Sequence, residues 1–223
     1  MVKKTSLSHL SPVLMLGVIW GLSEAALGMG LRSCASFMSG SIMTGVALFF
    51  IASSWYLTRA TYGVALVVII ASLFKMFDAL LLSLPLLHGA VGNPIFAFFM
   101  EGFAFLLLVF IFKKRLIKHP GGQAVAGGMA ALVAVNLFPL VKFATGIPAC
   151  VYPGTTMPLS LYYAPLAVLL SSLTVPLGLW FGYKVGTMEM NLSGTKHWKS
   201  VQYGAPVVLL LVCLGFISFL RLS

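Results

Sequence analysis

The chain alternates long apolar segments with short polar connections, and each apolar segment is long enough to cross a membrane as a helix. A hydrocarbon layer of about 30 Å needs about 20 apolar residues at a helical rise of about 1.5 Å. The segments are continuously apolar, as over residues 64–71, whereas a membrane β-strand alternates polar and apolar residues. We therefore expect an all-α, polytopic integral membrane helix bundle of about seven transmembrane helices, over residues 12–31, 39–57, 61–87, 94–112, 123–141, 162–183 and 204–220.

The composition excludes several classes of protein. Hydrophobic residues make up 60% of the 223 residues, charged residues only 8%, and the mean hydropathy is +1.05. Soluble domains carry roughly 25% charged residues, so a soluble enzyme, a disordered tail and a secreted disulfide scaffold are all excluded. The connections leave no room for an extramembrane domain of typical size, about 50 residues or more. We expect a single transmembrane domain over residues 1–223.

Two segments leave six spans as an alternative to seven. Lys3 and Lys4 precede the first segment as in a signal peptide, yet the apolar residues continue past Glu24 and no small-residue cleavage site follows. The first segment is therefore expected to remain as a span. The last segment, residues 204–220, is short and fits a peripheral helix as well as a span.

Positive charge is distributed unevenly over the two sides of a seven-span bundle. Three basic residues, Arg32, Lys142 and Arg221, fall on the side of the C-terminus. By the positive-inside rule the N-terminus is cytoplasmic, and we expect the protein in the cell membrane, the inner membrane in a bacterium. The basic connections are short and have no aromatic platform, so they suit anionic lipid headgroups and not nucleic acid. The ten basic residues on the N-terminal side are Lys3, Lys4, Arg59, Lys113, Lys114, Arg115, Lys118, Lys184, Lys196 and Lys199.

Four ionisable side chains fall inside the predicted spans: Glu24, Lys75, Asp78 and Glu101. A charged Lys or Asp at the centre of the bilayer costs about 2.5–3.5 kcal/mol on insertion scales. These side chains should therefore face the protein interior or water, beside partners. They are the strongest indication of function in the sequence.

Lys75 and Asp78 are three residues apart, so they share one face of the third span. The simplest interpretation is an internal ion pair that lets both residues enter the bilayer. In the alternative, the partner of Lys75 is either an anionic solute or one of the carboxyl groups of Glu24 and Glu101, and Asp78 orients the lysine. The span is 27 residues long, so it must tilt, bend at Pro85 or extend beyond the bilayer.

Glu24 lies on a stripe of small residues in the first span. Gly17, Gly21 and Gly28 recur at spacings of three or four with Glu24, and Trp20 lies beside the stripe. Small residues at this spacing allow another helix to approach closely. We therefore expect Glu24 in a tight helix contact or a narrow cavity.

Glu101 follows an aromatic run in the fourth span. Asn93 and Pro94 open this helix, because proline suits a first turn, and Glu101 lies about two turns further on. A carboxyl group buried among aromatic rings should favour its neutral form. Glu101 is therefore a candidate for carrying a proton or binding a cation. The alternative is a protonated side chain hydrogen-bonded to a neighbouring helix.

Asn136 is the polar residue of the fifth span, where its amide is placed to bond a solute or, more simply, another helix. It lies around the helix from a stripe of small residues that predicts a docking face: Ala124, Gly128, Ala131 and Val135.

The connection over residues 142–161 is apolar, with three prolines and two glycines. It predicts either a lid folded down onto the helices or a compact turn. Cys150 lies in this connection, on the same outer side as Cys34. The two thiols can form a disulfide or remain as small buried residues.

Residues for common catalytic chemistry are missing from the spans. All four histidines fall in tails or connections, and there is one aspartate. No zinc-type spacing of Cys with His, hydrolase motif or phosphate-binding loop is present. We therefore predict no metal site and no particular cofactor. An enzyme that uses Glu24 or Glu101 as an acid or base is disfavoured.

We predict a protein that transports or captures a small solute at an intramembrane polar site. Lacking a nucleotide-binding motif, it would draw energy from an ion gradient or from other subunits. A structural or assembly subunit of a membrane complex, with charges paired between subunits, is the alternative. The expected site residues are Trp20, Glu24, Lys75, Asp78, Glu101 and Asn136.

The chain resembles a known group of transport proteins in size and helical content. These are the substrate-binding subunits of energy-coupling-factor transporters, which usually have six spans. The spacing of Gly17, Gly21 and Ala25 is similar to the small-residue motif by which those subunits dock. The resemblance implies partner membrane subunits and an energising ATPase.

Overall fold

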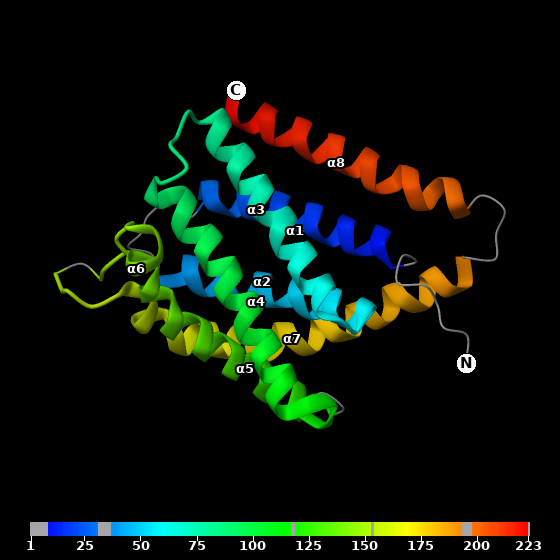
Figure 1. The fold of residues 1–223 in the computed structure, drawn as a ribbon, viewed down its shortest axis with the longest axis horizontal. Helices are drawn as coiled ribbons and strands as arrows, with labels where there is room; N and C mark the ends of the chain where they lie inside the picture. The colour runs from blue at the N-terminus through cyan, green and yellow to red at the C-terminus, as the bar shows by residue number, and fades with distance from the viewer. Residues whose placement is uncertain (1–8, 31–36, 117–118, 153, 193–197, 223) are drawn as a thin grey trace.

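The computed structural model describes residues 9–30, 37–116, 119–152, 154–192 and 198–222. Seven of the helices in these ranges are long and apolar enough to cross a membrane, so the predicted all-α membrane bundle is confirmed (Figure 1). The last segment, left open by the sequence, forms a full-length helix. The elements are α1 (Leu10–Gly30), α2 (Phe37–Thr58), α3 (Thr61–Leu81), α4 (Gly89–Leu116), α5 (Pro120–Leu137), η1 (Phe138–Leu140), α6 (Val141–Thr145), α7 (Leu159–Leu192) and α8 (Trp198–Leu222).

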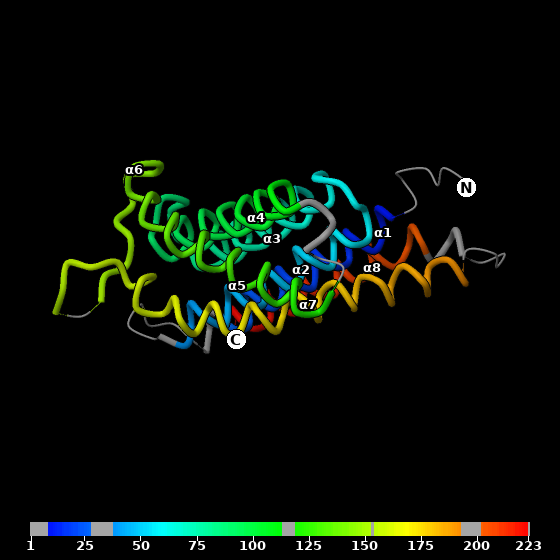
Figure 2. The backbone as a smooth tube through the Cα atoms, turned by 90° about the horizontal axis from the view of Figure 1, so that it is seen from below, coloured from blue at the N-terminus to red at the C-terminus, as the bar shows by residue number. Residues whose placement is uncertain are grey.

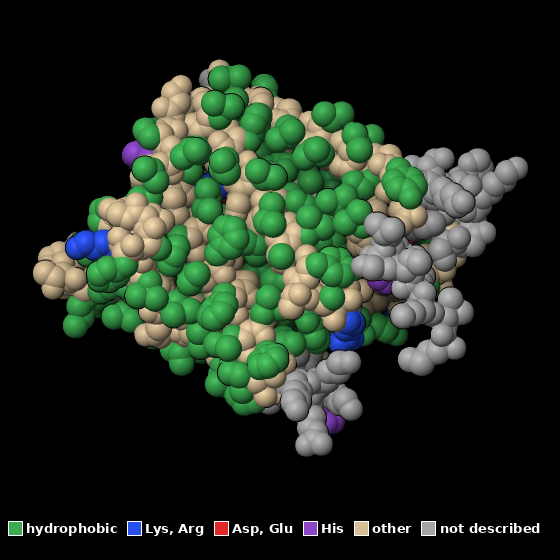
Figure 3. All heavy atoms as spheres, viewed as in Figure 1, with side chains coloured by type: hydrophobic (Ala, Val, Ile, Leu, Met, Phe, Trp, Pro, Cys, Tyr) green, Lys and Arg blue, Asp and Glu red, His purple; other side chains and the backbone are tan. Residues whose placement is uncertain are grey.

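The long helices run back and forth along the bundle, so the start of α1 and the end of α8 lie at opposite ends (Figure 1). α2 is central: it packs against α7, α3 and α1, and 67% of its span is buried. α8 is peripheral, packs mainly on α1, and has only 17% of its span buried. Hydrophobic side chains are spread over the face of the bundle seen in Figure 3, which suits contact with lipid.

The packing of α2 on α7 depends on small residues that the sequence analysis did not single out. A Cβ atom added to Gly182 of α7 would lie 2.6 Å from the carbonyl oxygen of Ser53 of α2, and Gly178 is equally crowded against Phe49. The hydroxyl of Ser53 donates to the carbonyl oxygen of Gly178 across the same contact, at 2.9 Å. Small residues and such hydrogen bonds are how helices associate where lipid removes the hydrophobic driving force.

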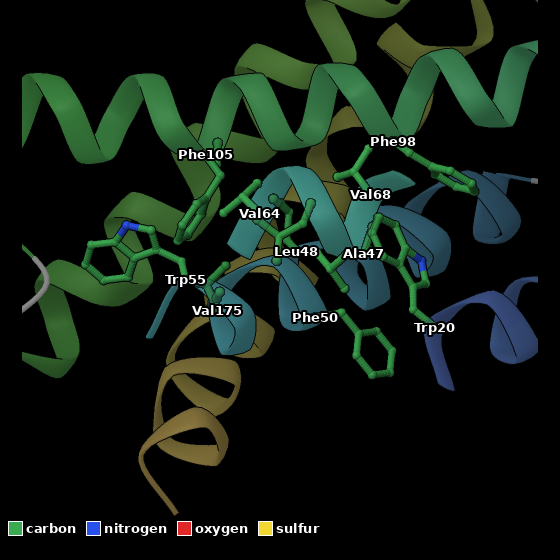
Figure 4. Packing of buried hydrophobic residues seen from close by; sticks show 14 of the residues in the cluster. Trp20, Ala47, Leu48, Phe50, Trp55, Val64, Val68, Phe98, Phe105 and Val175 are labelled. Carbon is green, nitrogen blue, oxygen red and sulfur yellow. The ribbon is translucent and has the colours of Figure 1, made fainter. Parts of the chain in front are cut away.

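Aromatic and aliphatic side chains from α1, α3, α4, α5 and α7 fill the interior beside α2, and Figure 4 shows part of this cluster. The ring of Trp20 lies 5.0 Å from that of Phe98 of α4 and 6.3 Å from that of Phe50 of α2. Trp20 is fully buried by these contacts.

The prediction of a 27-residue span at residues 61–87 is wrong, because α3 ends at Leu81. Ser83 adopts a left-handed conformation with φ of 53°, and its amide donates to the carbonyl oxygen of Leu80. The amide of Leu84 donates to Ala79, which completes the Schellman pattern that ends a helix. Glycine usually marks this position, so a serine within an apolar run gives no warning of it. Pro85 therefore lies outside the helix.

Pro94 does not open the fourth span, because α4 begins five residues earlier at Gly89. The side chain of His88 accepts a hydrogen bond from the amide of Ala90, at 3.2 Å, and so caps this start. Glu101 is 12 residues from the start of the 28-residue helix, which is about 18 Å along its axis. Glu101 thus lies near the middle of α4 and not two turns from its end.

The connection between α6 and α7 is a turn that projects beyond the helix ends (Figures 1 and 2). An isolated bridge joins Val151 to Pro158, and the described residues at its tip are exposed. Only its beginning folds back, where Ile147 is buried against Gly92 of α4. Cys150 is disulfide-bonded, whereas Cys34, the partner suggested by the sequence, lies outside the described residues.

Candidate functional site

Three of the four ionisable residues predicted inside the spans are buried, and the fourth, Lys75, is partly buried. The exposed fraction is 2% for Glu24, 3% for Asp78 and 4% for Glu101, and 11% for the side chain of Lys75. They come from α1, α3 and α4. Burial of this kind is tolerated in a membrane only when the charges meet partners or a polar cavity.

The main partner of Asp78 is Arg221 of α8. The guanidinium Nε donates to Oδ1 at 2.5 Å and Nη2 donates to Oδ2 at 2.8 Å, so both carboxylate oxygens are engaged. The expected ion pair with Lys75 is also present, but its Nζ lies 3.9 Å from Oδ2. Asp78 is therefore held by two cations, and the closer one comes from another helix.

Arg221 was assigned to the outer side from its place after the last apolar segment. In the structure α8 continues to Leu222, and the side chain of Arg221 is only 4% exposed. Cys213 and Ile217 precede it at intervals of four residues, so they share its helix face, and both are buried. This face packs on α1 and α3 and carries the arginine to Asp78.

Glu24 lies next to this pair, where α1 approaches α3. The indole nitrogen of Trp20 donates to its Oε1 at 3.4 Å, and the positive charge of Lys75 also acts on it. Gly21 makes the close approach possible, because an added Cβ would lie 2.5 Å from the Cβ of Phe74. The stripe of Gly17 and Gly21, similar to a docking motif, therefore contacts α3 of the same chain. We call Glu24, Lys75, Asp78 and Arg221 the charge network.

Glu101 lies on α4, beside a cavity of about 10 Å³ between α2, α4, α5 and α7. The side chain of Thr44 is its hydrogen-bond partner. Its second oxygen, Oε2, is buried and has no hydrogen-bond partner within the described ranges. Tyr163, Ala97 and Phe138 also line this cavity. We call Glu101, Thr44 and Tyr163 with this cavity the Glu101 pocket.

The charge that acts on Glu101 is the like charge of Glu24. Trp20 and Phe98 pack together at 5.0 Å, on α1 and α4 respectively. Trp20 precedes Glu24 by four residues and Phe98 precedes Glu101 by three, so each ring lies one turn from a carboxyl group. The predicted site thus separates into a paired charge network and an unpaired carboxyl group.

Asn136 is not part of either group. Its side chain is exposed, and its amide donates to the carbonyl oxygen of Leu132 in its own helix, at 2.7 Å. The small residues of α5 face α7: an added Cβ at Gly127 would meet the backbone of Ser171, and one at Gly128 would meet the hydroxyl of Ser172. That stripe is a helix contact within the chain.

A further buried pair lies at the end of the bundle where α1 begins. Nδ1 of His9 lies 2.7 Å from Oε2 of Glu189, which is 3% exposed. The predicted span over residues 162–183 would leave Glu189 in the connection that follows it. α7 in fact continues to Leu192, so the pair joins α7 to the start of α1.

No known protein family, curated protein or solved structure matches this chain. Across the described ranges no three side chains of the types His, Cys, Asp and Glu are grouped to hold a metal ion.

Proposed function

We propose that this membrane protein transports or captures a small solute at the polar groups inside its bundle. The observation that carries the proposal is the Glu101 pocket, where a buried carboxyl group faces a cavity with one oxygen unbonded. Such a group destabilises a bundle that has no use for it. Intramembrane ionisable residues beside a cavity are typical of solute and ion pathways.

The charge network supplies the second part of this proposal. It brings one carboxylate and one ammonium group, Glu24 and Lys75, near the ion pair of Asp78 with Arg221. An acidic solute would compete with Glu24 for Lys75, and a basic solute would compete with Lys75 for Glu24. The cavity of about 10 Å³ holds about one water molecule. A larger solute would therefore enter only when helices separate, as in alternating access.

We place the protein in the cell membrane with a cytoplasmic N-terminus, in accord with the positive-inside rule. Energy would come from an ion gradient or from partner subunits with an ATPase. A partner would not use Gly17 and Gly21, because α3 covers them. The apolar outer face of α8 is the more accessible surface, with Val208 61% and Leu211 63% exposed.

A structural or assembly subunit is the second candidate. The observation that favours it is the Asp78–Arg221 pair, in which both carboxylate oxygens are bonded within the chain, together with the 17% burial of the α8 span. In that case the charge network would fix α8 in place for contact with another membrane protein.

Mass spectrometry of the protein purified in mild detergent tests the two candidates. The compound that co-purifies with the wild type is then supplied to liposomes containing the protein. We expect uptake to fall at least about tenfold in Glu24→Gln, because a charge-assisted contact contributes about 1.5–3 kcal/mol. Asn136→Ala, an exposed polar residue outside both groups, should transport normally. No bound compound, together with a protein partner lost in Glu24→Gln, would establish the assembly subunit instead.

A further inference from the structure

The charges inside the bundle do not balance. The described spans bury four carboxyl groups, those of Glu24, Asp78, Glu101 and Glu189, and Glu189 has His9 as its partner at one end of the bundle. The other three share two cations, Arg221, which is buried, and Lys75, whose side chain is 11% exposed. Both cations lie in the charge network, at Asp78 and Glu24. An uncompensated charge in a medium of low dielectric constant is strongly unfavourable. Glu101 therefore needs a positive charge from outside the chain.

The groups around Glu101 indicate the chemistry of that charge. Thr44, the hydrogen-bond partner of Glu101, and Tyr163, which lines the cavity, each carry a hydroxyl oxygen, and oxygen ligands suit hard cations. A divalent ion prefers six or more oxygen ligands and more than one carboxylate, which the pocket does not supply. The volume of about 10 Å³ admits one small particle without a shell of water.

We propose that the Glu101 pocket binds one small monovalent cation, either a proton or a sodium ion without its hydration shell. The cation binds to the unpartnered Oε2 of Glu101, and the hydroxyl groups of Thr44 and Tyr163 complete the site. The site stands whether or not the protein also transports a solute. If it does, the cation is a candidate for the coupling ion.

Two residues of α2 position Tyr163 in the pocket. A Cβ atom added to Gly40 would lie 2.6 Å from Cε1 of the tyrosine ring, so any larger residue at this position would displace the ring. The hydroxyl of Ser41 donates to the backbone carbonyl oxygen of Tyr163 at 3.2 Å. Gly40 and Ser41 thus hold α7 to α2 on the side of the pocket where Thr44 lies, one turn further along α2.

The ionisable groups that act on Glu101 are Glu24 from α1 and Tyr163 from α7. α3 presents Val68, whose Cγ2 would lie 3.2 Å from a Cβ added to Gly102. The residues of α2 and α5 that line the cavity have no ionisable side chain. A response to pH or sodium that depends on Glu101 therefore reports on this pocket and its neighbour Glu24.

Two binding measurements on the purified protein in lipid nanodiscs test the proposal without any transport assay. The first is equilibrium binding of radioactive sodium, and the second is the infrared signal of a carboxyl group that gains or loses a proton as pH changes. We expect one of the two signals at about one site per chain, lost in Glu101→Gln. Sodium binding identifies the cation as sodium, and a carboxyl signal without sodium binding identifies it as a proton.

Glu189→Gln is the matched control for loss of a buried carboxyl group, because Glu189 lies in another part of the bundle. It should keep whichever signal the wild type shows. The absence of both signals from the wild type, or their survival in Glu101→Gln, would overturn the proposal. Failure of solute uptake with the cation signal intact would count against the transport function alone.

If Glu101→Gln does not fold, the hydroxyl groups provide the test. Thr44→Val and Tyr163→Phe remove one oxygen each with little change of shape. Each should weaken cation binding about tenfold, as expected for one bond to a charged group. Ser171→Ala removes a buried, unpartnered hydroxyl of α7 that does not line the cavity, and it should bind normally. Binding unchanged in both pocket variants would overturn the proposal.

Discussion

The charge network and the Glu101 pocket bury the same kinds of side chain in opposite ways. In the network, Asp78 accepts two hydrogen bonds from Arg221 and lies 3.9 Å from Lys75. In the pocket, Glu101 has a hydroxyl partner and a neighbouring carboxyl group, and Oε2 is unbonded among the described residues. In the first arrangement the carboxylate has its cations within the chain, whereas in the second we propose that a bound cation supplies the positive charge. Burial alone therefore does not distinguish a structural charge from a functional one. The hydrogen-bond and ion-pair partners of the buried group make that distinction.

The largest effect is expected from removing the cation that completes the network. Arg221→Met leaves Asp78 with only the distant Lys75, and breaking a buried ion pair in this way costs about 3–5 kcal/mol. We expect a fall of this size in the free energy of unfolding, measured by denaturant titration of the purified protein. Lys142→Ala, an exposed cation in the short α6, should change it little. Equal stability of Arg221→Met and Lys142→Ala would show that the network does not hold α8.

A smaller effect is expected from separating α1 from α3, which carries Glu24 away from Lys75. Gly21→Ala places a methyl group 2.5 Å from the Cβ of Phe74, an atom that moves only with its backbone. We expect a loss of about 1–3 kcal/mol in the same titration, as for other overpacked sites. Gly215→Ala on α8 has open space around it and should raise stability by about 0.5–1 kcal/mol. A change in the free energy of unfolding that has the same sign in both variants would argue against the tight α1–α3 contact.

The smallest effect on stability, but a clear effect on binding, is expected at the pocket. Gly40→Ala displaces the ring of Tyr163, whose contacting atom lies at the far end of the side chain and can yield. We expect a loss of about 1 kcal/mol or less in stability. Cation binding should weaken about tenfold, as for loss of the tyrosine hydroxyl. An unchanged binding constant would show that Tyr163 is not a ligand.

The seven spans and the burial of Glu24, Lys75, Asp78 and Glu101 were predictable, because a continuous apolar run and an isolated charge inside it have direct physical consequences. The partners were not predictable. Arg221 lies 143 positions from Asp78 in the sequence, and nothing local indicates that α8 packs on α1.

Helix ends and weakly polar ligands were the other omissions. α3 ends at Leu81, two residues before a serine in a left-handed conformation, and α7 continues nine residues beyond its apolar run. Counting apolar residues therefore misplaced both ends. Threonine and tyrosine are common in membrane-spanning helices, so the sequence does not mark Thr44 and Tyr163 as site residues. Only their position around Glu101 in the structure does. A signal for Arg221 did exist: it shares a face, at intervals of four residues, with Cys213 and Ile217.

The same chemical change at two buried carboxyl groups tests the central claim most directly. Asp78→Asn and Glu101→Gln each replace a carboxylate by an amide of equal size, and the free energy of unfolding is measured at alkaline pH without sodium. We predict that Asp78→Asn loses about 3–5 kcal/mol, because Arg221 is left unpaired. Glu101→Gln should instead gain about 1 kcal/mol, because it removes an uncompensated charge. A loss in Glu101→Gln as large as that in Asp78→Asn would contradict the account.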